Sequence, residues 1–415
     1  MRLIYADPGL VNQMGHHNTM CRNLAAALRA RGCTVEILGA VNIEPMLSTE
    51  LGAAAYFRAS PHFVTDGDPY CGWLSGFFLG ADMAHGDFAR LSVTADDVIY
   101  LASGQAAHLM GLTRWLGSLT PQQRPAVIID MVHPPGIMRA PGQGWLTVDP
   151  RVDAQAAFYR FTAHQIRAHG LSKLHFVCVA PDFAQAFSEL LGQTVIHINT
   201  LPFARSVSAE RRGRRPSTVA VLGYQVEHKG YHLVPEIAAL VLHARPDTRF
   251  AIHNSKPQGM AQTQDQLRRM AAADARVTVH EGALNDAAFQ AVPAATDLLL
   301  CPYNPDYYRA ALSGVVAEGI ASGVPLVVPG GTLMAETAIR NGCGVAFETF
   351  TVPSIARAVT AALDGIDGLA GAALREATRW AGAGRPAPLR QRHSRRGGAL
   401  VPRRREALYR AHVGA

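Results

Sequence analysis

The sequence has little of what marks membrane, secreted and disordered proteins. No apolar run in its 415 residues approaches the roughly 20 residues that a bilayer-spanning helix needs. The opening residues MRLIYADPG are typical of a strand and a loop, and they lack the basic and apolar regions of a signal peptide. With 48% hydrophobic and 17% charged residues, the composition is that of a globular protein. We expect two or three domains and a cytoplasmic location.

Paired cysteines and a convincing metal motif are also lacking. The six cysteines are scattered and form no CxxC pair, which indicates a reducing compartment and argues against a disulfide framework or a zinc site. Asp66 and Asp68 match the DxD pattern of a metal pair, but they lie in a loop rich in glycine and proline, where a turn is the simpler interpretation. We predict no metal ion and no cofactor.

Lysine is absent from residues 384–415, although this segment holds nine arginines and one glutamate. Its formal charge of +8 exceeds the +7 of the whole chain, so the other residues sum to −1. A fold-wide basic surface is therefore not expected, and nucleic acid is not favoured as a partner. The segment could bind anionic lipid headgroups, bind nucleic acid, or be an extension without a selected role, such as an out-of-frame reading of a GC-rich gene.

The N-terminal half predicts a doubly wound α/β domain over residues 1–204. It opens with a strand (RLIYA), a loop, a helix within residues 18–32 and a second strand (CTVEILGA), which together form a βαβ unit. The loop holds one glycine before the helix, Gly15, so the GxGxxG fingerprint of a dinucleotide site is missing. The sequence Gly15-His16-His17 could still let the backbone approach a ligand closely, and a simple turn is the alternative.

Another buried strand in this domain, AVIIDMV, runs directly into His133 and a Pro-Pro-Gly turn. Residues just past the carboxyl ends of parallel strands line the crevice where such sheets bind ligands. His133 is therefore a candidate for hydrogen bonding or acid/base chemistry, with a structural role as the alternative. Residues 44–92 show no clear periodicity and are rich in aromatic residues, glycine and proline, so we interpret them as an insertion or lid beside the ligand.

Residues 205–217 (RSVSAERRGRRPS) are polar, rich in arginine and without apolar periodicity, and we predict a linker there. The βαβ pattern then restarts and predicts a second α/β domain over residues 218–367. Its expected strands are STVAVLG, RFAIHNS, VTVHEG, TDLLLC, PLVVP and GVAFE. Residues 368–383 are a candidate crossover helix between the domains.

One stretch of the second domain, residues 297–331, combines a strand, a loop, a helix and a strand. Ser313 stands where a helix N-cap is expected, and the apolar-periodic residues GVVAEGIA follow it. The free N–H groups and positive dipole of such a helix start suit a phosphate. Glu318 is the single carboxylate in this apolar helix, so it is either a ligand for hydroxyl groups or a capping or solvent-facing residue.

The second domain resembles the donor-binding half of GT-B glycosyltransferases. It is most similar to the large retaining group (group 1, family 4-type) that includes phosphatidylinositol mannosyltransferases and bacterial polysaccharide glycosyltransferases. Four pieces carry the resemblance in the order found in that family: VAVLGYQVEHKG, VTVHEGALNDAAFQAVPAATDLLLCPY, SGVVAEGIASGVPLVVPGG and MAETAIRNGCGVAF. The N-terminal MGHHNTMCRNLAAALRARGCTVEIL resembles the glycine loop, helix and strand of the same family. The resemblance implies a GT-B fold, in which two Rossmann-like domains face a central cleft.

The resemblance also implies a role for each matching residue. The donor diphosphate would be bound by Lys229 and by the helix N–H groups after Ser313, and Glu318 would accept hydrogen bonds from the ribose. His133 would contact the transferred sugar or the acceptor. Neither a nucleophilic carboxylate nor a metal would be required, because the leaving phosphate is thought to help deprotonate the acceptor. The remaining donor-binding candidates are Gly15, His16, Gly223, Gly314 and Val315.

Two positions depart from the family pattern. Ala310 stands where the family has its first Glu, and Tyr224 stands where it has an Arg. The first change removes a carboxylate that would hold sugar hydroxyls, and the second removes a bidentate phosphate donor. Asp306, Tyr308 or Arg309 could substitute for the missing groups.

We expect a glycosyltransferase that moves a sugar from a UDP- or GDP-sugar to a glycan or lipid-linked acceptor in cell-surface polysaccharide or glycolipid synthesis. The aromatic-rich residues 56–88 would suit an amphipathic acceptor or peripheral contact with the inner face of the membrane, and a plain hydrophobic core explains them equally well. A degenerate GT-B scaffold that binds a glycan or protein partner is the main alternative, and a sugar-nucleotide epimerase or a phosphorylase is a minor one.

Overall fold

We describe the fold from a computed structural model of the chain. The structure describes residues 1–13, 16–59, 72–132, 135–140, 144–147, 155–198, 217–254, 260–282, 284, 286–309 and 313–383. These residues form two compact units, one ending before Phe203 and one beginning after Pro202. Each unit is a parallel sheet with helices packed on it, as the hydrophobic patterns predict.

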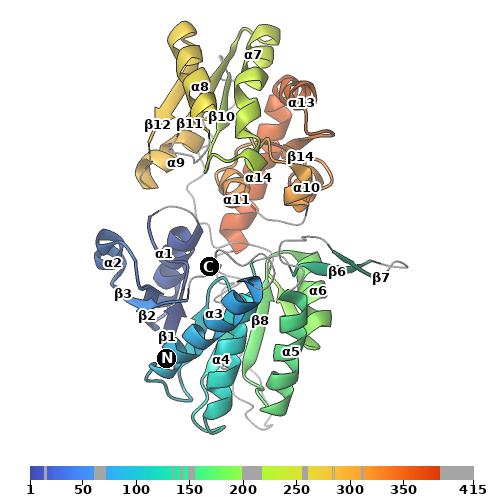
Figure 1. The fold of residues 1–415 in the computed structure, drawn as a ribbon. Helices are drawn as coiled ribbons and strands as arrows, with labels where there is room; N and C mark the ends of the chain where they lie inside the picture. The colour runs from blue at the N-terminus through green and yellow to red at the C-terminus, as the bar shows by residue number, and fades with distance from the viewer. Residues whose placement is uncertain are drawn as a thin grey trace, which may run out of the picture. The chain divides into compact units, whose positions relative to one another are not determined.

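The first unit contains a seven-stranded sheet in the order β3-β2-β1-β4-β5-β8-β9, and all of its strand pairs are parallel. Its strands are β1 (Arg2–Ala6), β2 (Thr34–Ala40), β3 (Ala53–Phe57), β4 (Val98–Leu101), β5 (Ala126–Asp130), β8 (Leu174–Cys178) and β9 (Val195–His197). Its helices are α1 (His16–Arg29), α2 (Pro45–Leu51), α3 (Gly72–Ala89), α4 (Ala106–Ser118), α5 (Gln155–Ala168) and α6 (Pro181–Leu191). In Figure 1 helices α3, α4 and α5 lie side by side, and α4 packs against both neighbours.

Two features of the first unit differ from the sequence interpretation. Residues 44–92 are not simply an insertion, because β3 pairs in parallel with β2 and α3 is a helix of 18 residues that packs on α4. Strand β3 was hard to recognise because its five residues AAAYF are mostly alanine and carry little hydrophobic contrast. A short antiparallel hairpin of β6 (Ile137–Ala140) and β7 (Gly144–Thr147) was also not predicted.

The second unit contains a six-stranded parallel sheet in the order β12-β11-β10-β13-β14-β15. In chain order this is 3-2-1-4-5-6, the order of a Rossmann-type sheet. Its strands are β10 (Ser217–Val221), β11 (Thr248–Asn254), β12 (Val277–Glu281), β13 (Leu298–Leu300), β14 (Leu326–Pro329) and β15 (Gly344–Phe347). Its helices are η2 (Glu227–Lys229), η3 (Tyr231–Leu233), α7 (Val234–Ala244), α8 (Ala261–Ala273), α9 (Asp286–Ala294), α10 (Pro305–Tyr308), α11 (Gly314–Ala321), α12 (Leu333–Arg340), α13 (Val352–Asp364) and α14 (Ile366–Ala383).

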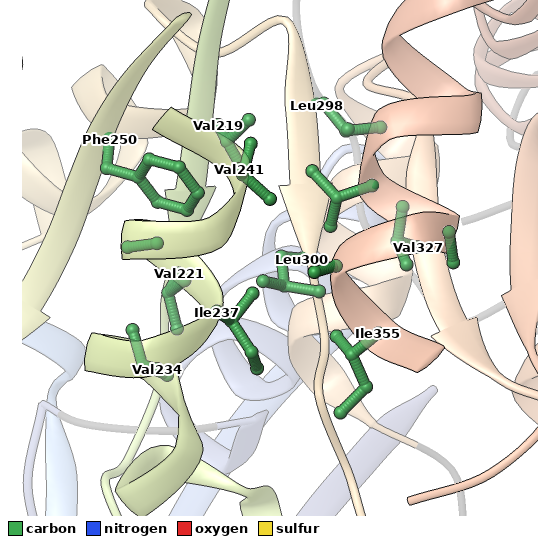
Figure 2. Packing of buried hydrophobic residues seen from close by; sticks show 14 of the residues in the cluster. Val219, Val221, Val234, Ile237, Val241, Phe250, Leu298, Leu300, Val327 and Ile355 are labelled. Carbon is green, nitrogen blue, oxygen red and sulfur yellow. The ribbon is translucent and has the colours of Figure 1, made fainter. Parts of the chain in front are cut away.

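Both faces of the second sheet are covered by apolar side chains. Figure 2 shows one face, where Val219 and Val221 of β10 and Leu300 of β13 meet Ile237 of α7 and Ile355 of α13. Short strands buried on both faces consist largely of Val, Leu and Ile, which is why they were recognisable in the sequence. Helix α14 spans the predicted residues 368–383, begins two residues earlier, and packs on α11 and α13 of its own unit.

Candidate functional site

The predicted donor residues of the second unit gather where its sheet reverses its strand order. Strand β10 lies next to β13 there, and a Rossmann-type sheet binds ligands outside the carboxyl ends of the two strands at this point. The loop after β10 carries Gly223 and Lys229, and the loop after β13 leads through Tyr303 to Ser313 and α11. The fold therefore brings together residues that lie about 90 positions apart in the sequence.

Gly223 has a backbone conformation and surroundings that exclude a side chain. Its φ of +99° lies in the region that favours glycine, and a Cβ atom placed there would lie 2.8 Å from Val315 Cγ2 and 3.8 Å from Lys229 Nζ. The position thus keeps the space between the loop after β10 and the start of α11 clear. Three of the predicted donor residues, Gly223, Lys229 and Val315, are neighbours in the structure.

Lys229 is a half-buried cation at this place, and burial lowers its pKa. Its Nζ lies 5.7 Å from the centre of the Tyr303 ring. Among the residues that the structure describes, no carboxylate lies within 4.0 Å of it to form an ion pair. A lysine held in this way has a charge that the protein leaves available for an anion.

The neighbouring glycine, Gly230, fixes the direction of the Lys229 loop. Its φ is +67°, and a Cβ atom there would lie 1.8 Å from the carbonyl oxygen of Pro302. The two loops are also joined by the N–H of Asn304, which donates to the carbonyl oxygen of His228 at 2.9 Å. The His228 ring stacks on Tyr307 with ring centres 4.0 Å apart.

Helix α11 begins as predicted, with Ser313 in extended conformation at its N-cap. The Ser313 hydroxyl does not cap the helix, however, and instead donates to the Tyr303 hydroxyl at 3.2 Å. The first bond of the helix runs from the N–H of Ala317 to the carbonyl oxygen of Ser313 at 3.0 Å. The N–H groups of Gly314, Val315 and Val316 therefore have no acceptor within the helix, and N–H groups in this position of a helix can donate to an anion.

Glu318 lies one turn further along α11 and is only 7% exposed. This burial rules out the solvent-facing alternative for its side chain. Its neighbours Val316, Ala317 and Ile320 are also buried, so Glu318 is a carboxylate within an apolar helix, as the sequence indicates.

Some predicted positions cannot be placed. Gly15, His133, Ala310, Asp66 and Asp68 lie outside the described residues. Residues 205–216 of the predicted linker and residues 384–415 also lie outside them. Tyr224, which replaces the family arginine, is 47% exposed in the loop after β10.

His16 is the first residue of α1 in the first unit, and its ring centre lies 4.2 Å from that of His17. The His17 ring belongs to a polar cluster that the sequence reasoning missed. Its Nδ1 lies 2.8 Å from the Asp7 carboxylate, which is fully buried at the end of β1. Asp130 at the end of β5 is also fully buried and accepts a hydrogen bond from the Tyr100 hydroxyl at 2.8 Å.

Only weak signals for this cluster were present in the sequence. Asp7 and Asp130 each stand at the end of an apolar strand, so both carboxylates occupy the ligand-binding edge of the first sheet. Burial raises the pKa of Asp130 to about 7, although the hydrogen bond from Tyr100 acts in the opposite direction.

The described residues contain no cluster of three or more histidines, cysteines, aspartates or glutamates suited to a metal ion. None of the described helices has both the length and the apolar character required to cross a membrane.

Solved structures share the fold over nearly the whole chain. Sucrose-phosphate synthase from Thermosynechococcus elongatus matches with a TM-score of 0.58 and 12% identity, over 92% of this chain and 95% of that one. HepE from Anabaena, solved in complex with UDP-glucose, matches with a TM-score of 0.55, 12% identity and the same coverage. The N-terminal domain of trehalose-6-phosphate phosphatase from Candida albicans matches with a TM-score of 0.56 and 10% identity, over 91% and 93% of the two chains.

These likenesses show that the chain has a GT-B fold of two parallel-sheet α/β domains, which confirms the predicted fold class. No protein-family model matches the sequence, and no curated protein matches it either.

Proposed function

We propose that the protein is a glycosyltransferase that moves a sugar from a nucleotide-sugar donor to a glycan or lipid-linked acceptor. The observation that carries this proposal is the position of Lys229, a cation without a described carboxylate partner, beside the N-terminal amides of α11. A point charge and a row of N–H groups are complementary to a diphosphate. Solved neighbours named as glycosyltransferases, and HepE with its bound UDP-glucose, support a nucleotide-sugar as the ligand.

Glu318 extends the proposed site from the phosphates to the ribose. It lies about one turn beyond the free N–H groups of Gly314 and Val315, and a buried carboxylate there can accept hydrogen bonds from ribose hydroxyls. The resemblance to retaining enzymes supports a transfer that retains the anomeric configuration and needs no metal. We also propose action in cell-surface polysaccharide or glycolipid synthesis, in the cytoplasm or on the inner face of the membrane.

Calorimetric titration with UDP-, GDP- and ADP-sugars tests the proposal. At least one of these nucleotide-sugars should bind to the wild-type protein. Glu318→Ala should weaken that binding by about tenfold or more, which corresponds to a loss of roughly 1.4 kcal/mol in binding free energy. Glu318→Gln keeps the shape of the side chain, and Glu336→Ala on α12 removes an exposed carboxylate of the same unit as a control. The proposal is contradicted if none of the nucleotide-sugars binds to the wild-type protein, or if Glu318→Ala binds them as tightly as the wild type does.

A scaffold that binds a glycan or protein partner without transfer is the alternative. It is favoured by Tyr224, whose exposed phenol cannot replace the bidentate phosphate contacts of an arginine. The match to a domain named as part of a phosphatase also shows that the fold alone does not imply transfer. Transfer of sugar to any acceptor, detected by mass spectrometry of the product, would exclude this alternative.

A further inference from the structure

Two aromatic side chains lie stacked beside the candidate donor site of the second unit. His228 directly precedes Lys229 in the loop after β10, and Tyr307 belongs to α10 in the loop after β13. Their ring centres lie 4.0 Å apart with an angle of 10° between the ring planes, which is a parallel stack. This stacked pair therefore comes from the same two loops that carry Lys229 and lead to α11.

Backbone contacts between the two loops hold the stacked pair in place. The N–H of Asn304 donates to the carbonyl oxygen of His228 at 2.9 Å, so the segments that carry the two rings are joined directly. The Asn304 side chain accepts a hydrogen bond from the N–H of Asp306 at 2.9 Å and thereby caps α10, the helix that carries Tyr307. The positions of both rings are thus set before a ligand arrives, and a preorganised surface lowers the entropy cost of binding.

Two further tyrosines connect the stacked pair to the start of α11. The Tyr308 ring centre lies 5.2 Å from that of Tyr307 and 4.7 Å from that of Tyr303. The Tyr303 hydroxyl accepts the bond from Ser313, the N-cap of α11, and Lys229 Nζ lies 5.7 Å from the Tyr303 ring centre. A continuous set of contacts therefore links the stacked pair to both parts of the proposed diphosphate site.

The two neighbouring tyrosines of α10 differ in exposure. Tyr308 is 6% exposed, as expected of a ring that packs for stability, whereas Tyr307 is 37% exposed although the His228 ring covers one of its faces. Aromatic side chains that line ligand sites offer a large, rigid and apolar contact surface. Tyr307 offers such a surface at the ligand-binding edge of the second sheet.

This surface suits the apolar face of a sugar ring. An aromatic face is electron-rich, and the C–H groups of a pyranose carry a small positive charge, so the two attract each other. Residues 301–309 of the same loop contain one carboxylate, Asp306, whose side chain is 87% exposed. This part of the loop therefore offers aromatic rings, and no buried carboxylate, to a sugar beside it.

A nucleobase is the other planar group of the donor that could stack here. The proposed ribose contact, Glu318, lies beyond the free N–H groups of α11, whereas Tyr307 lies in the loop that leads to the start of this helix. The base with its ribose and the sugar are attached to opposite ends of the diphosphate. The order of these residues along the site therefore favours the sugar over the base.

We propose that the stacked rings of His228 and Tyr307 are the surface on which the sugar of the donor lies, and that the donor is a pyranose with C–H groups facing these rings. This inference rests on the proposed binding of a nucleotide-sugar. The stacked pair takes part in no bond-making step. It orients the sugar while Lys229 and the amides of α11 hold the diphosphate.

Calorimetric titration of the full-length protein with matched ligands tests the stacking. UDP-glucose, GDP-mannose and ADP-glucose are each compared with their own diphosphates, and the nucleotide-sugar that binds the wild type most tightly is then used with the variants. In Tyr307→Ala the affinity for this nucleotide-sugar should fall by about 3- to 10-fold, the range expected for one lost aromatic contact, while the affinity for its diphosphate stays the same.

Two further variants serve as controls. Tyr307→Phe keeps the ring and removes the hydroxyl, so it should bind the nucleotide-sugar as the wild type does. Phe161→Ala removes an exposed ring from α5 of the first unit and should leave donor affinity unchanged.

Proton NMR of the wild-type protein with the same nucleotide-sugar gives a readout that needs no variant. Protons that lie over an aromatic ring are shielded, so the C–H signals of the bound sugar should move upfield. Sugar signals that keep their free positions on binding would overturn the proposal.

The outcomes distinguish this inference from the proposed function. A wild-type protein that binds none of the nucleotide-sugars contradicts the proposed function itself. Unchanged affinity of Tyr307→Ala for the nucleotide-sugar contradicts only the role of the stacked pair. An equal loss of affinity for the nucleotide-sugar and its diphosphate would also contradict that role, because the base lying on the ring, or a merely structural role of Tyr307, would produce it.

Discussion

At Lys229 the requirements of protein stability and of ligand binding oppose each other. Burial lowers its pKa, which means that the folded protein disfavours the charged ammonium, and no described carboxylate compensates for this cost. The pattern is expected of a group retained for a ligand rather than for the fold.

Replacement of Lys229 by methionine should therefore have two opposite effects. Affinity for UDP should fall by about 10- to 100-fold, because a charge-assisted hydrogen bond contributes roughly 1.5–3 kcal/mol. The free energy of unfolding in urea should stay the same or rise. Lys173→Met, an exposed lysine that donates to the Arg124 carbonyl in the first unit, serves as the control. An unchanged UDP affinity in Lys229→Met would show that Lys229 is not part of the donor site.

The raised pKa of Asp130 should make the stability of the folded protein depend on pH. Burial raises its pKa to about 7 in the folded chain, against about 3.9 for an unfolded aspartate. The folded state thus favours the protonated form of Asp130. The contribution of Asp130 to the free energy of unfolding is therefore complete below about pH 4 and is lost as the pH rises toward 7. Asp130→Asn stays neutral, so its melting temperature relative to wild type should rise between pH 4 and 7 and then level off. A difference that does not vary with pH would contradict the buried, protonated carboxyl.

The loop between β10 and α7 should be sensitive to the addition of a single methyl group at Gly230. In Gly230→Ala the new Cβ would overlap the Pro302 carbonyl oxygen and would require an unfavourable φ of +67°. We expect a loss of about 2 kcal/mol or more in urea unfolding, and weaker UDP binding because Lys229 moves with the loop. Gly368→Ala in α14 has no atom within 4 Å of its Cβ and should stabilise the protein by about 0.5–1 kcal/mol. Equal stability of the two variants would contradict the clash.

Elements with strong local patterns were predictable from the sequence, and contacts between distant segments were not. The start of α11 at Ser313 and Gly314 followed from its cap residue and apolar periodicity, because these signals lie within a few residues of each other. The Asp7–His17 contact depends on how β1 and α1 pack, and the sequence alone does not show that the two side chains meet. The edge strand β3 was missed because a short alanine-rich segment carries little hydrophobic contrast.

For the whole molecule, the two α/β domains were predictable from the alternation of strands and helices, and the GT-B fold was predictable from the resemblance of their motifs to that family. The candidate donor site was predictable only in part. Lys229, Gly223 and Val315 are neighbours as the resemblance implied, whereas no sequence pattern showed that Ser313 would bond to Tyr303 instead of capping its helix.

The uneven charge of the chain predicts the effect of removing residues 384–415. The shortened chain has a formal charge of −1 instead of +7 and should no longer be retained on a cation-exchange column. Its UDP affinity should equal that of the full chain, because none of the candidate donor residues lies within residues 384–415. Weaker UDP binding by the shortened chain would show that the basic segment contributes to the donor site.

The central claim is that the second unit recognises a nucleoside diphosphate through Lys229 and the start of α11. Calorimetric titration of the wild-type protein with UDP, GDP and ADP, each beside its free nucleoside, measures this recognition directly. We predict that at least one diphosphate binds about 100-fold or more tightly than its nucleoside, a difference of roughly 2.7 kcal/mol. Equal affinity for diphosphate and nucleoside, or no binding of any of the three diphosphates, would contradict the account.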